Sequence, residues 1–305
     1  MASFVTQNVT NSSNQIDERY FALLAHDKAI YITVCVIQFL LGSSLNISVI
    51  FVFRRNCHLL DIPANLILLN MSIMDFVSCF ILLPCEMCVT LVGENSRGEM
   101  WKIPYFSLFF TLNVSIHGAI LMSVDRLLAI IYPLRYHAIV TVSRTRLILA
   151  LNWFVSFLLA ILYYTQYLIA ANNTSFEYIL STRDLLGFAV ICVSYGTISR
   201  IAGKQVRRIA VDDGKTTSKY CSLVCKRSLK SAKKSGAVVF FFLLTCLPYP
   251  LIETFSHFSS NKYNNKTLFW SYTLLFWQSV CNPVLFCVFS EKLRRIARKT
   301  LCYPC

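Results

Sequence analysis

The sequence predicts an all-α membrane protein: a bundle of seven transmembrane helices and an amphipathic eighth helix, with the N-terminus outside. Three observations support this fold class. The 305 residues are 56% hydrophobic and only 14% charged, whereas a soluble domain is usually about 25% charged. Seven apolar stretches are long enough to cross a hydrocarbon core, which takes about 20 helical residues. The basic residues gather in alternate connecting segments, a pattern typical of membrane proteins.

The seven apolar stretches define the predicted spans. Prolines inside them, such as Pro84 and Pro283, are tolerated in membrane helices because neighbouring groups satisfy the freed carbonyls. The fifth stretch is the weakest, because its apolar core is short and Arg183 and Asp184 stand at its start. The predicted spans are Ile30–Phe53, Pro63–Val92, Ile103–Ile131, Leu147–Ile169, Leu185–Ile201, Gly236–Phe258 and Leu268–Phe289.

Charge placement orients the chain. Most of the 29 Lys and Arg residues fall in the first, third and fifth connecting segments or in the C-terminal tail, and the segment from Arg200 to Lys234 is the richest. The positive-inside rule makes these segments cytoplasmic. The predicted organisation is an extracellular segment 1–29, a bundle 30–289, and a cytoplasmic amphipathic helix with a short tail, 290–305. The net charge of +14 then reflects topology, with anionic lipid or a cytoplasmic protein as its counterpart, and nucleic acid is not expected to bind.

Modification motifs agree with this orientation. All Asn-X-Ser/Thr sequons outside the spans lie in segments predicted to be extracellular. Cysteines are missing from these segments, so no outer disulfide is expected, whereas two cysteines after the basic amphipathic stretch suit S-palmitoylation. The expected glycosylation sites are Asn8, Asn11, Asn172, Asn173 and Asn265, and the expected palmitoylation sites are Cys302 and Cys305.

Polar residues inside the spans form the first candidate site, because intramembrane ionisable groups usually face the bundle interior. A lone buried Asp75 would tend to protonate. Hydroxyl and amide neighbours would instead let it hold a sodium ion or a shared water network. The alternative is a purely structural hydrogen-bond network. The expected cluster is Asp75, Asn46, Ser115, Ser279 and Asn282, and no other cofactor is predicted.

Seven motifs stand in order along the spans, and together they resemble the rhodopsin-like (class A) G-protein-coupled receptors over nearly the whole chain. The most specific are Asp125-Arg126-Leu, followed by Ile-Ile-Tyr-Pro-Leu-Arg-Tyr136, and Asn282-Pro-Val-Leu-Phe286. The remaining matches are Asn46, the pattern from Asn65 to Asp75, Trp153, Tyr195, Phe242 and Pro248.

The resemblance implies a role for each matched residue. Asp125 would pair with Arg126 in the inactive receptor. On activation helix 6 would move outward, and Arg126 would contact the C-terminal helix of a Gα subunit. Leu134 would insert into a hydrophobic groove of the same subunit. The other implied switch residues are Tyr195, Phe242, Cys246, Pro248, Asn282, Pro283 and Phe286.

Several positions depart from the family pattern. Cys246 replaces the helix 6 tryptophan, and Phe286 replaces the helix 7 tyrosine, so its hydroxyl link to Tyr195 cannot form. Trp101 replaces the outer helix 3 cysteine and Gly187 the helix 5 proline. The loss of these last two features resembles the melanocortin and cannabinoid branch.

The expected ligand pocket is aromatic and apolar, as small-molecule sites usually are. Leu108 occupies the position where monoamine receptors carry an amine-binding Asp, which argues against ordinary aminergic binding. Glu86 and Glu253 add acids near the outer ends of helices 2 and 6 and favour a cationic small molecule or peptide. If Arg183 neutralises one of them, the pocket suits a lipid instead. The remaining expected lining residues are Trp101, Phe109, Leu112, Tyr249, Tyr272 and Phe276.

Two other classes of protein fit the sequence less well. A transporter would show inverted repeats with broken helices in matching halves, and the chain has no such symmetry. An intramembrane enzyme would need a nucleophile with its base or a set of metal ligands, yet the five histidines are scattered. The predicted function is therefore a multi-pass plasma-membrane receptor that couples an extracellular ligand to a heterotrimeric G protein, and not an enzyme.

Overall fold

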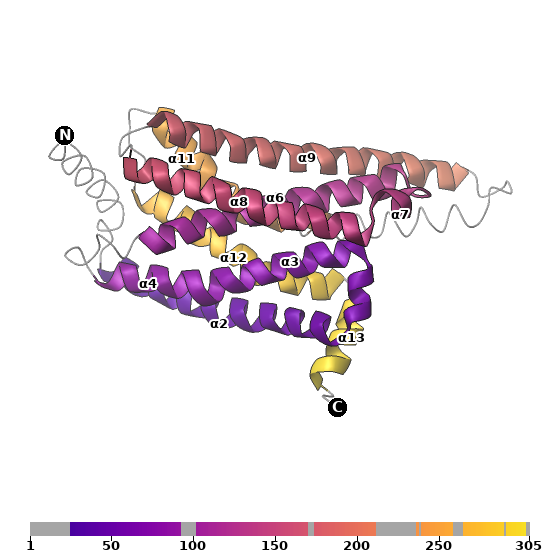
Figure 1. Ribbon diagram of the computed structural model, residues 1–305, viewed down its shortest axis with the longest axis horizontal. Helices are drawn as coiled ribbons and strands as arrows, with labels where there is room; N and C mark the ends of the chain where they lie inside the picture. The colour runs from indigo at the N-terminus through magenta and orange to yellow at the C-terminus, as the bar shows by residue number, and fades with distance from the viewer. Residues whose placement is uncertain are drawn as a thin grey trace.

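The computed structural model describes residues 25–92, 102–169, 174–211, 236–237, 239–258, 265–289 and 291–302. These residues are almost entirely helical, and the long helices run side by side along the longest axis (Figure 1). Helices bond their own backbone groups internally, which is what a lipid environment requires. The elements are α2 (Ala25–Arg55), η1 (Cys57–Asp61), α3 (Pro63–Val77), η2 (Ser78–Leu82), α4 (Leu83–Val92), α6 (Lys102–Ile131), α7 (Tyr136–Ile139), α8 (Val142–Ile169), α9 (Thr174–Val211), α11 (Pro248–Phe258), α12 (Asn265–Phe289) and α13 (Glu291–Cys302).

An apolar helix occupies the position of each predicted span. Five helices are long and apolar enough to cross a membrane, and two shorter apolar helices, Val239–Ile252 and Thr273–Cys287, lie where the sixth and seventh spans are predicted. The five longer stretches are Asp27–Arg55, Pro63–Cys88, Phe109–Ile131, Val142–Thr165 and Thr182–Ile201.

Several helices begin earlier than the apolar pattern predicts, including α2 at Ala25 rather than Ile30 and α12 at Asn265 rather than Leu268. Helix α8 starts at Val142 rather than at Leu147, because the Thr141 hydroxyl accepts the Arg144 amide at 3.3 Å and caps the first turn. Helix α9 starts at Thr174 rather than at Leu185. The Arg183 guanidinium pairs with the Asp184 carboxylate at 2.6 Å, which lets both charges lie within the helix.

The second span contains a change of helical pitch. The turn Ser78–Leu82 has π-helical geometry and Pro84 follows it, so α3 and α4 form one helix with a bulge between them. Such π-bulges are frequent at functional sites. Beyond the bulge Glu86 is turned into the protein and is only 3% exposed.

Close packing joins α2 to this bulge. A Cβ atom added at Gly42 would lie 2.2 Å from the Cys79 Sγ atom, so any larger residue there would force the Cys79 side chain to move. At the other end of α2, the Asn56 side chain donates a hydrogen bond of 3.1 Å to Thr300 on α13. Helix α13 falls within residues 290–305, where the sequence predicts an amphipathic helix. It lies beside the end of α2 (Figure 1).

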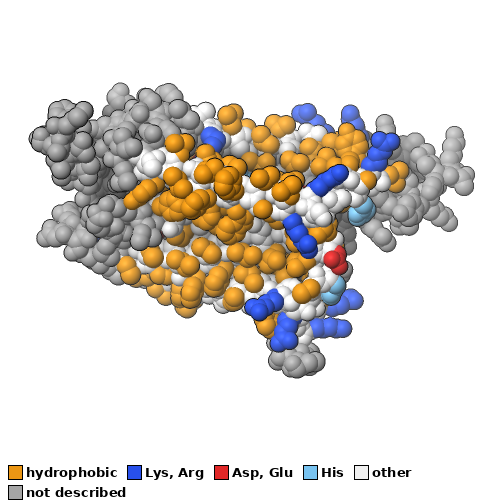
Figure 2. All heavy atoms as spheres, viewed as in Figure 1, with side chains coloured by type: hydrophobic (Ala, Val, Ile, Leu, Met, Phe, Trp, Pro, Cys, Tyr) orange, Lys and Arg blue, Asp and Glu red, His pale blue; other side chains and the backbone are white. Residues whose placement is uncertain are grey.

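The surface separates apolar from basic side chains. Figure 2 shows hydrophobic side chains over the middle of the bundle and most Lys and Arg side chains at the end where α7 and α13 lie. Large apolar residues such as Leu147, Phe154 and Val193 are more than half exposed. An apolar belt of this kind is what lipid contact demands, and the basic end corresponds to the predicted cytoplasmic side.

Candidate functional site

Three side chains of α12 converge on the Asp75 carboxylate of α3 at the centre of the bundle. Asp75 is 1% exposed. Its Oδ1 atom accepts hydrogen bonds from the Ser279 hydroxyl at 2.9 Å and the Gln278 amide at 3.2 Å. Its Oδ2 atom accepts a bond of 2.9 Å from the Asn282 amide. The structure therefore joins Asp75, Ser279 and Asn282 directly, as the sequence predicts.

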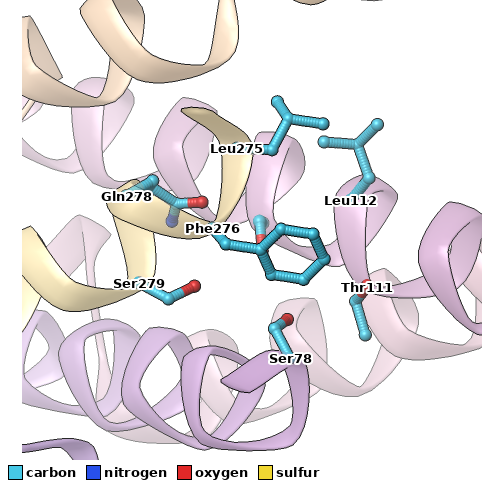
Figure 3. A pocket seen from close by; sticks show the side chains of 8 residues that line it. Ser78, Thr111, Leu112, Leu275, Phe276, Gln278 and Ser279 are labelled. Carbon is cyan, nitrogen blue, oxygen red and sulfur yellow. The ribbon is translucent and has the colours of Figure 1, made fainter. Parts of the chain in front are cut away.

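The other two members of the predicted cluster, Asn46 and Ser115, do not bind the Asp75 carboxylate directly. The Asn46 amide donates to the Ser279 backbone carbonyl at 2.8 Å and to the Gly42 carbonyl at 2.9 Å, so it bridges α2 and α12. Ser115 lines a small cavity that Ser279 also lines (Figure 3). The five residues therefore form one connected cluster, although only Ser279 and Asn282 among the predicted partners bind the Asp75 carboxylate.

Gln278 is a member that sequence reasoning missed. It donates to Asp75 and also accepts a weak hydrogen bond from the Cys246 thiol at 3.7 Å. Cys246 stands where the family pattern has a tryptophan and is 1% exposed. A polar chain therefore runs from helix 6 through Gln278 to Asp75, and the only sequence signal for it was a glutamine inside an apolar span.

The predicted pair near the C-terminal end of α6 is present. The Arg126 guanidinium lies 2.7 Å from the Asp125 carboxylate, with the two side chains 15% and 4% exposed. The Tyr136 hydroxyl of α7 donates a second bond of 2.6 Å to the same carboxylate. Burial and the negative charge of Asp125 raise the pKa of Tyr136. Leu134 is 72% exposed and available to a partner.

Tyr195 and Phe286 belong to different packing clusters. The Tyr195 hydroxyl is buried and makes no hydrogen bond among the residues that the structure describes. Phe286 packs with the apolar residues Ile67, Met71 and Met122. Among the described residues, Tyr195 and Phe286 thus lie in separate environments, and the effect of the missing Phe286 hydroxyl stays a prediction.

The predicted pocket residues have mixed outcomes. Leu112 and Phe276 line the small cavity named above, Phe109 stacks on Tyr163 with centroids 3.5 Å apart, and Tyr249 packs against the core. Trp101 and the side chains of Leu108, Glu253 and Tyr272 lie outside the described part of the structure.

Arg183 pairs with its neighbour in sequence. Its Nε and Nη2 atoms bind the Asp184 Oδ1 atom at 3.0 Å and 2.6 Å, so the described residues do not favour the alternative in which Arg183 neutralises Glu86. Asp184 is adjacent in sequence, so this pair forms at a much lower cost in chain entropy than a pair between helices.

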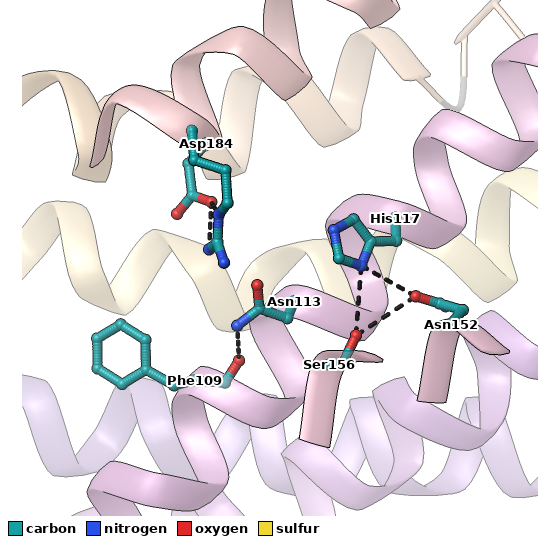
Figure 4. Close-up of polar contacts among 7 residues, drawn as sticks. Phe109, Asn113, His117, Asn152, Ser156 and Asp184 are labelled. Carbon is teal, nitrogen blue, oxygen red and sulfur yellow. Dashed lines mark hydrogen bonds and ion pairs between the residues drawn. The ribbon is translucent and has the colours of Figure 1, made fainter. Parts of the chain in front are cut away.

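A second polar cluster fastens α6 to α8. The His117 ring Nδ1 atom lies 3.0 Å from the Asn152 amide oxygen and 3.3 Å from the Ser156 hydroxyl (Figure 4). The neighbouring Trp153 donates its indole N–H to the Asn70 side chain at 2.6 Å, joining α8 to α3. These contacts give His117 a packing role between helices, and in the described residues no group of three His, Cys, Asp or Glu side chains suits a metal.

Comparison with known proteins decides the family. A profile described as 7 transmembrane receptor (rhodopsin family) matches residues 45–286. The chain belongs to this family. Among its relatives, trace amine-associated receptor 7d of Mus musculus is 26% identical over 285 residues, which cover 83% of this receptor and 76% of the relative. Trace amine-associated receptor 9 of Rattus norvegicus is 24% identical over 284 residues, with 83% and 80% covered.

The family membership confirms the resemblance seen in the motifs. The receptor is a multi-pass membrane protein of a signalling family and not an enzyme. The finer resemblance to the melanocortin and cannabinoid branch stays a prediction. The predicted modification sites Asn8, Asn11, Asn172, Asn173 and Cys305, with the side chains of Asn265 and Cys302, lie outside the described residues.

Proposed function

We propose that this receptor is a seven-helix bundle of the plasma membrane that couples an extracellular ligand to a heterotrimeric G protein. The contact between Asp125, Arg126 and Tyr136 supports this proposal most directly. An arginine held by a carboxylate at the cytoplasmic end can be released, and its release exposes a cation to a partner protein. The N-terminus is extracellular, and α13 is the amphipathic eighth helix on the cytoplasmic surface.

Outward movement of helix 6 is the proposed switch. The helical run from Val239 bends at Leu247 before Pro248, whose ring removes a backbone donor. Phe242 packs against Phe188 of α9 at 5.9 Å between ring centroids. Outward movement of the part of helix 6 that precedes Pro248 separates these two rings and opens the cytoplasmic end of the bundle beside Arg126.

The ligand is proposed to carry a positive group. Glu86 is a buried acid of the outer helical segment α4, and a partly desolvated carboxylate favours a cation. The relatives are named for trace amines, which is consistent with an amine bound in a mode that does not use Leu108. The alternative ligand is a lipid, which the apolar lining of the pocket favours.

A sodium ion is the proposed resident of the Asp75 cluster. Carboxylate and hydroxyl oxygens suit a hard cation, and Asp75, Ser279 and Ser115 supply such oxygens. A bound sodium would compensate the buried charge and favour the inactive arrangement. Asn46 and Asn282 would hold the surrounding helices in place through the bonds described above.

Nucleotide exchange in cell membranes tests the proposal. Membranes that contain the receptor should accelerate GTPγS binding to a promiscuous Gα subunit, and Arg126→Ala should abolish this acceleration at matched surface expression. Arg54→Ala is the control, because Arg54 is an exposed cation at the cytoplasmic end of α2. Full exchange by Arg126→Ala would show that coupling does not use this residue. Asp125→Asn should raise basal exchange, because it weakens the restraint on the guanidinium.

A further inference from the structure

Two free cysteines stand three residues apart on the helical segment α4. Cys85 is half-buried and Cys88 is exposed. Residues three apart on a helix are neighbours on one face, so both thiols lie on the same side of α4. The two side chains are close enough for a charge on Cys88 to act on Cys85. Among the cysteines that the structure describes, no other two are spaced by three or four residues.

The pair lies away from the basic end of the bundle. The apolar part of the second span ends at Cys88, and α4 stands opposite the end where most of the described Lys and Arg side chains gather (Figures 1 and 2). In the topology proposed above, this is the extracellular end. An ion in the outer solution can therefore reach Cys88 directly, whereas Cys35 and Cys79 are buried.

The spacing of the two cysteines favours a bridging ion over a disulfide. On a regular helix the Cβ atoms of residues three apart are about 5–6 Å from each other, whereas a disulfide needs about 3.5–4.5 Å. At the thiolate–zinc bond length of about 2.3 Å, two bonds in line hold their sulfur atoms about 4.6 Å apart. Rotamer changes alone satisfy such an ion, whereas a disulfide requires the helix to distort.

The number and kind of ligands select the ion. Thiolates are soft ligands that favour Cu(I) and Zn²⁺. Zn²⁺ usually takes four ligands, and no group of three His, Cys, Asp or Glu side chains in the described residues suits a metal. Glu86 follows Cys85 in sequence but is only 3% exposed, so it is turned away from the exposed thiol. Cu(I) is satisfied by two thiolates in line and needs no third ligand.

We propose that Cys85 and Cys88 form a two-coordinate site for a soft monovalent cation of the Cu(I) class. Each thiol gives its proton to water, and two sulfur–metal bonds replace the two S–H bonds. No electron is transferred, and the complex carries one negative charge. Water can screen that charge, because Cys88 is exposed.

The bound ion would act on the segment that carries Glu86. Helix α4 follows the π-bulge, and Glu86 lies between the two cysteines in sequence. The ion therefore fastens one turn of α4 to the next and adds a negative charge beside this turn. A cationic agonist should gain potency when the site is loaded. Only this effect rests on the proposed function, because binding of the ion needs no G protein.

Competition for Cu(I) measures the site in the purified receptor. The probe is the coloured bicinchoninate complex of Cu(I), kept reduced with ascorbate, whose absorbance falls when the metal moves to the protein. The receptor should remove one more equivalent than the variant with both Cys85→Ser and Cys88→Ser. Each single variant should lose that whole equivalent, because one thiolate cannot chelate. Cys192→Ser should keep it, since Cys192 is an exposed cysteine of α9 without a second cysteine one turn away.

Alkylation gives a second measurement that needs no variant. Iodoacetamide should label Cys85 and Cys88 in the metal-free receptor, as peptide mass analysis will show. One equivalent of Cu(I) should protect both residues. Cys57 and Cys192 are also exposed and should stay reactive, because each stands alone on its element.

The other outcomes overturn the proposal. Equal uptake by the receptor and the double serine variant would place the metal elsewhere, and so would a single variant that keeps the full equivalent. An equal loss in Cys192→Ser would mean non-specific binding to exposed thiols. Resistance of both cysteines to alkylation until a reductant is added would show a disulfide in place of the metal site. Uptake of Cu(I) by a receptor that gives no GTPγS exchange would instead refute the receptor function and keep the site.

Discussion

The Tyr136 hydroxyl donates a 2.6 Å hydrogen bond to the same Asp125 carboxylate that pairs with Arg126. Tyr136 begins the short helix α7 between α6 and α8, so this connecting segment is tied to the carboxylate that pairs with Arg126. Two independent contacts therefore fix one carboxylate that is 4% exposed. The position of the loop and the restraint on Arg126 are consequently coupled.

The first prediction is that Tyr136→Phe raises basal signalling. A hydrogen bond to a charged group contributes about 1.5–3 kcal/mol, and its loss frees Asp125 to leave Arg126. Basal GTPγS exchange should increase severalfold at matched surface expression. Tyr132→Phe is the control, since Tyr132 is 48% exposed. An unchanged basal rate in Tyr136→Phe would mean that the loop does not restrain the pair.

The second prediction concerns the contact between α2 and the π-bulge. Gly42→Ala places a Cβ atom 2.2 Å from the Cys79 Sγ atom and 3.0 Å from its Cβ atom, and overpacking of this kind costs about 1–3 kcal/mol. The Tm of the purified receptor should fall, and Cys79→Ala should restore part of the loss. Gly196→Ala is the matched control, because no atom lies within 4 Å of the added Cβ. Equal Tm values for the two alanine variants would contradict the close packing.

The third prediction tests the orientation of the chain. Glycosidase treatment should shift the electrophoretic mobility of the receptor, and the shift should be lost when Asn8 and Asn11 are both changed to Gln. An epitope tag inserted near Lys215 should be labelled only after the cells are permeabilised, because this segment carries the densest positive charge. Labelling of the tag on intact cells would reverse the topology.

Sequence patterns predicted the parts of the receptor that depend on local order. Apolar runs placed the helices, and the motif spacing brought Asp75, Ser279 and Asn282 together as observed. Asp125 and Arg126 are adjacent, so their pairing needed only a helix end. These features depend on the residues of a single segment or on the order of motifs that the chain shares with its family.

Contacts that depend on helix rotation were not predictable. Gln278 reaches Asp75 only because α12 is turned to place it there, and a single glutamine in an apolar run does not reveal its facing neighbour. The π-bulge at Ser78–Leu82 changes the direction of everything beyond it in the second span. The sequence left open whether Arg183 neutralises a distant acid, and the structure pairs it with its sequence neighbour Asp184.

The last prediction concerns the charge of the ligand. Glu86 is buried beyond the π-bulge, and a charge-assisted hydrogen bond from a ligand contributes about 1.5–3 kcal/mol. A loss of that size lowers the potency of a cationic agonist at least tenfold. Glu86→Gln should therefore weaken the most potent tertiary or quaternary amine found in a GTPγS screen, and Glu253→Gln should do the same if both acids face the pocket. The Gln side chain keeps the shape of the site, so the comparison isolates the charge. Unchanged potency in both glutamine variants, or activation by a neutral lipid alone, would rule out a cationic ligand in the outer pocket.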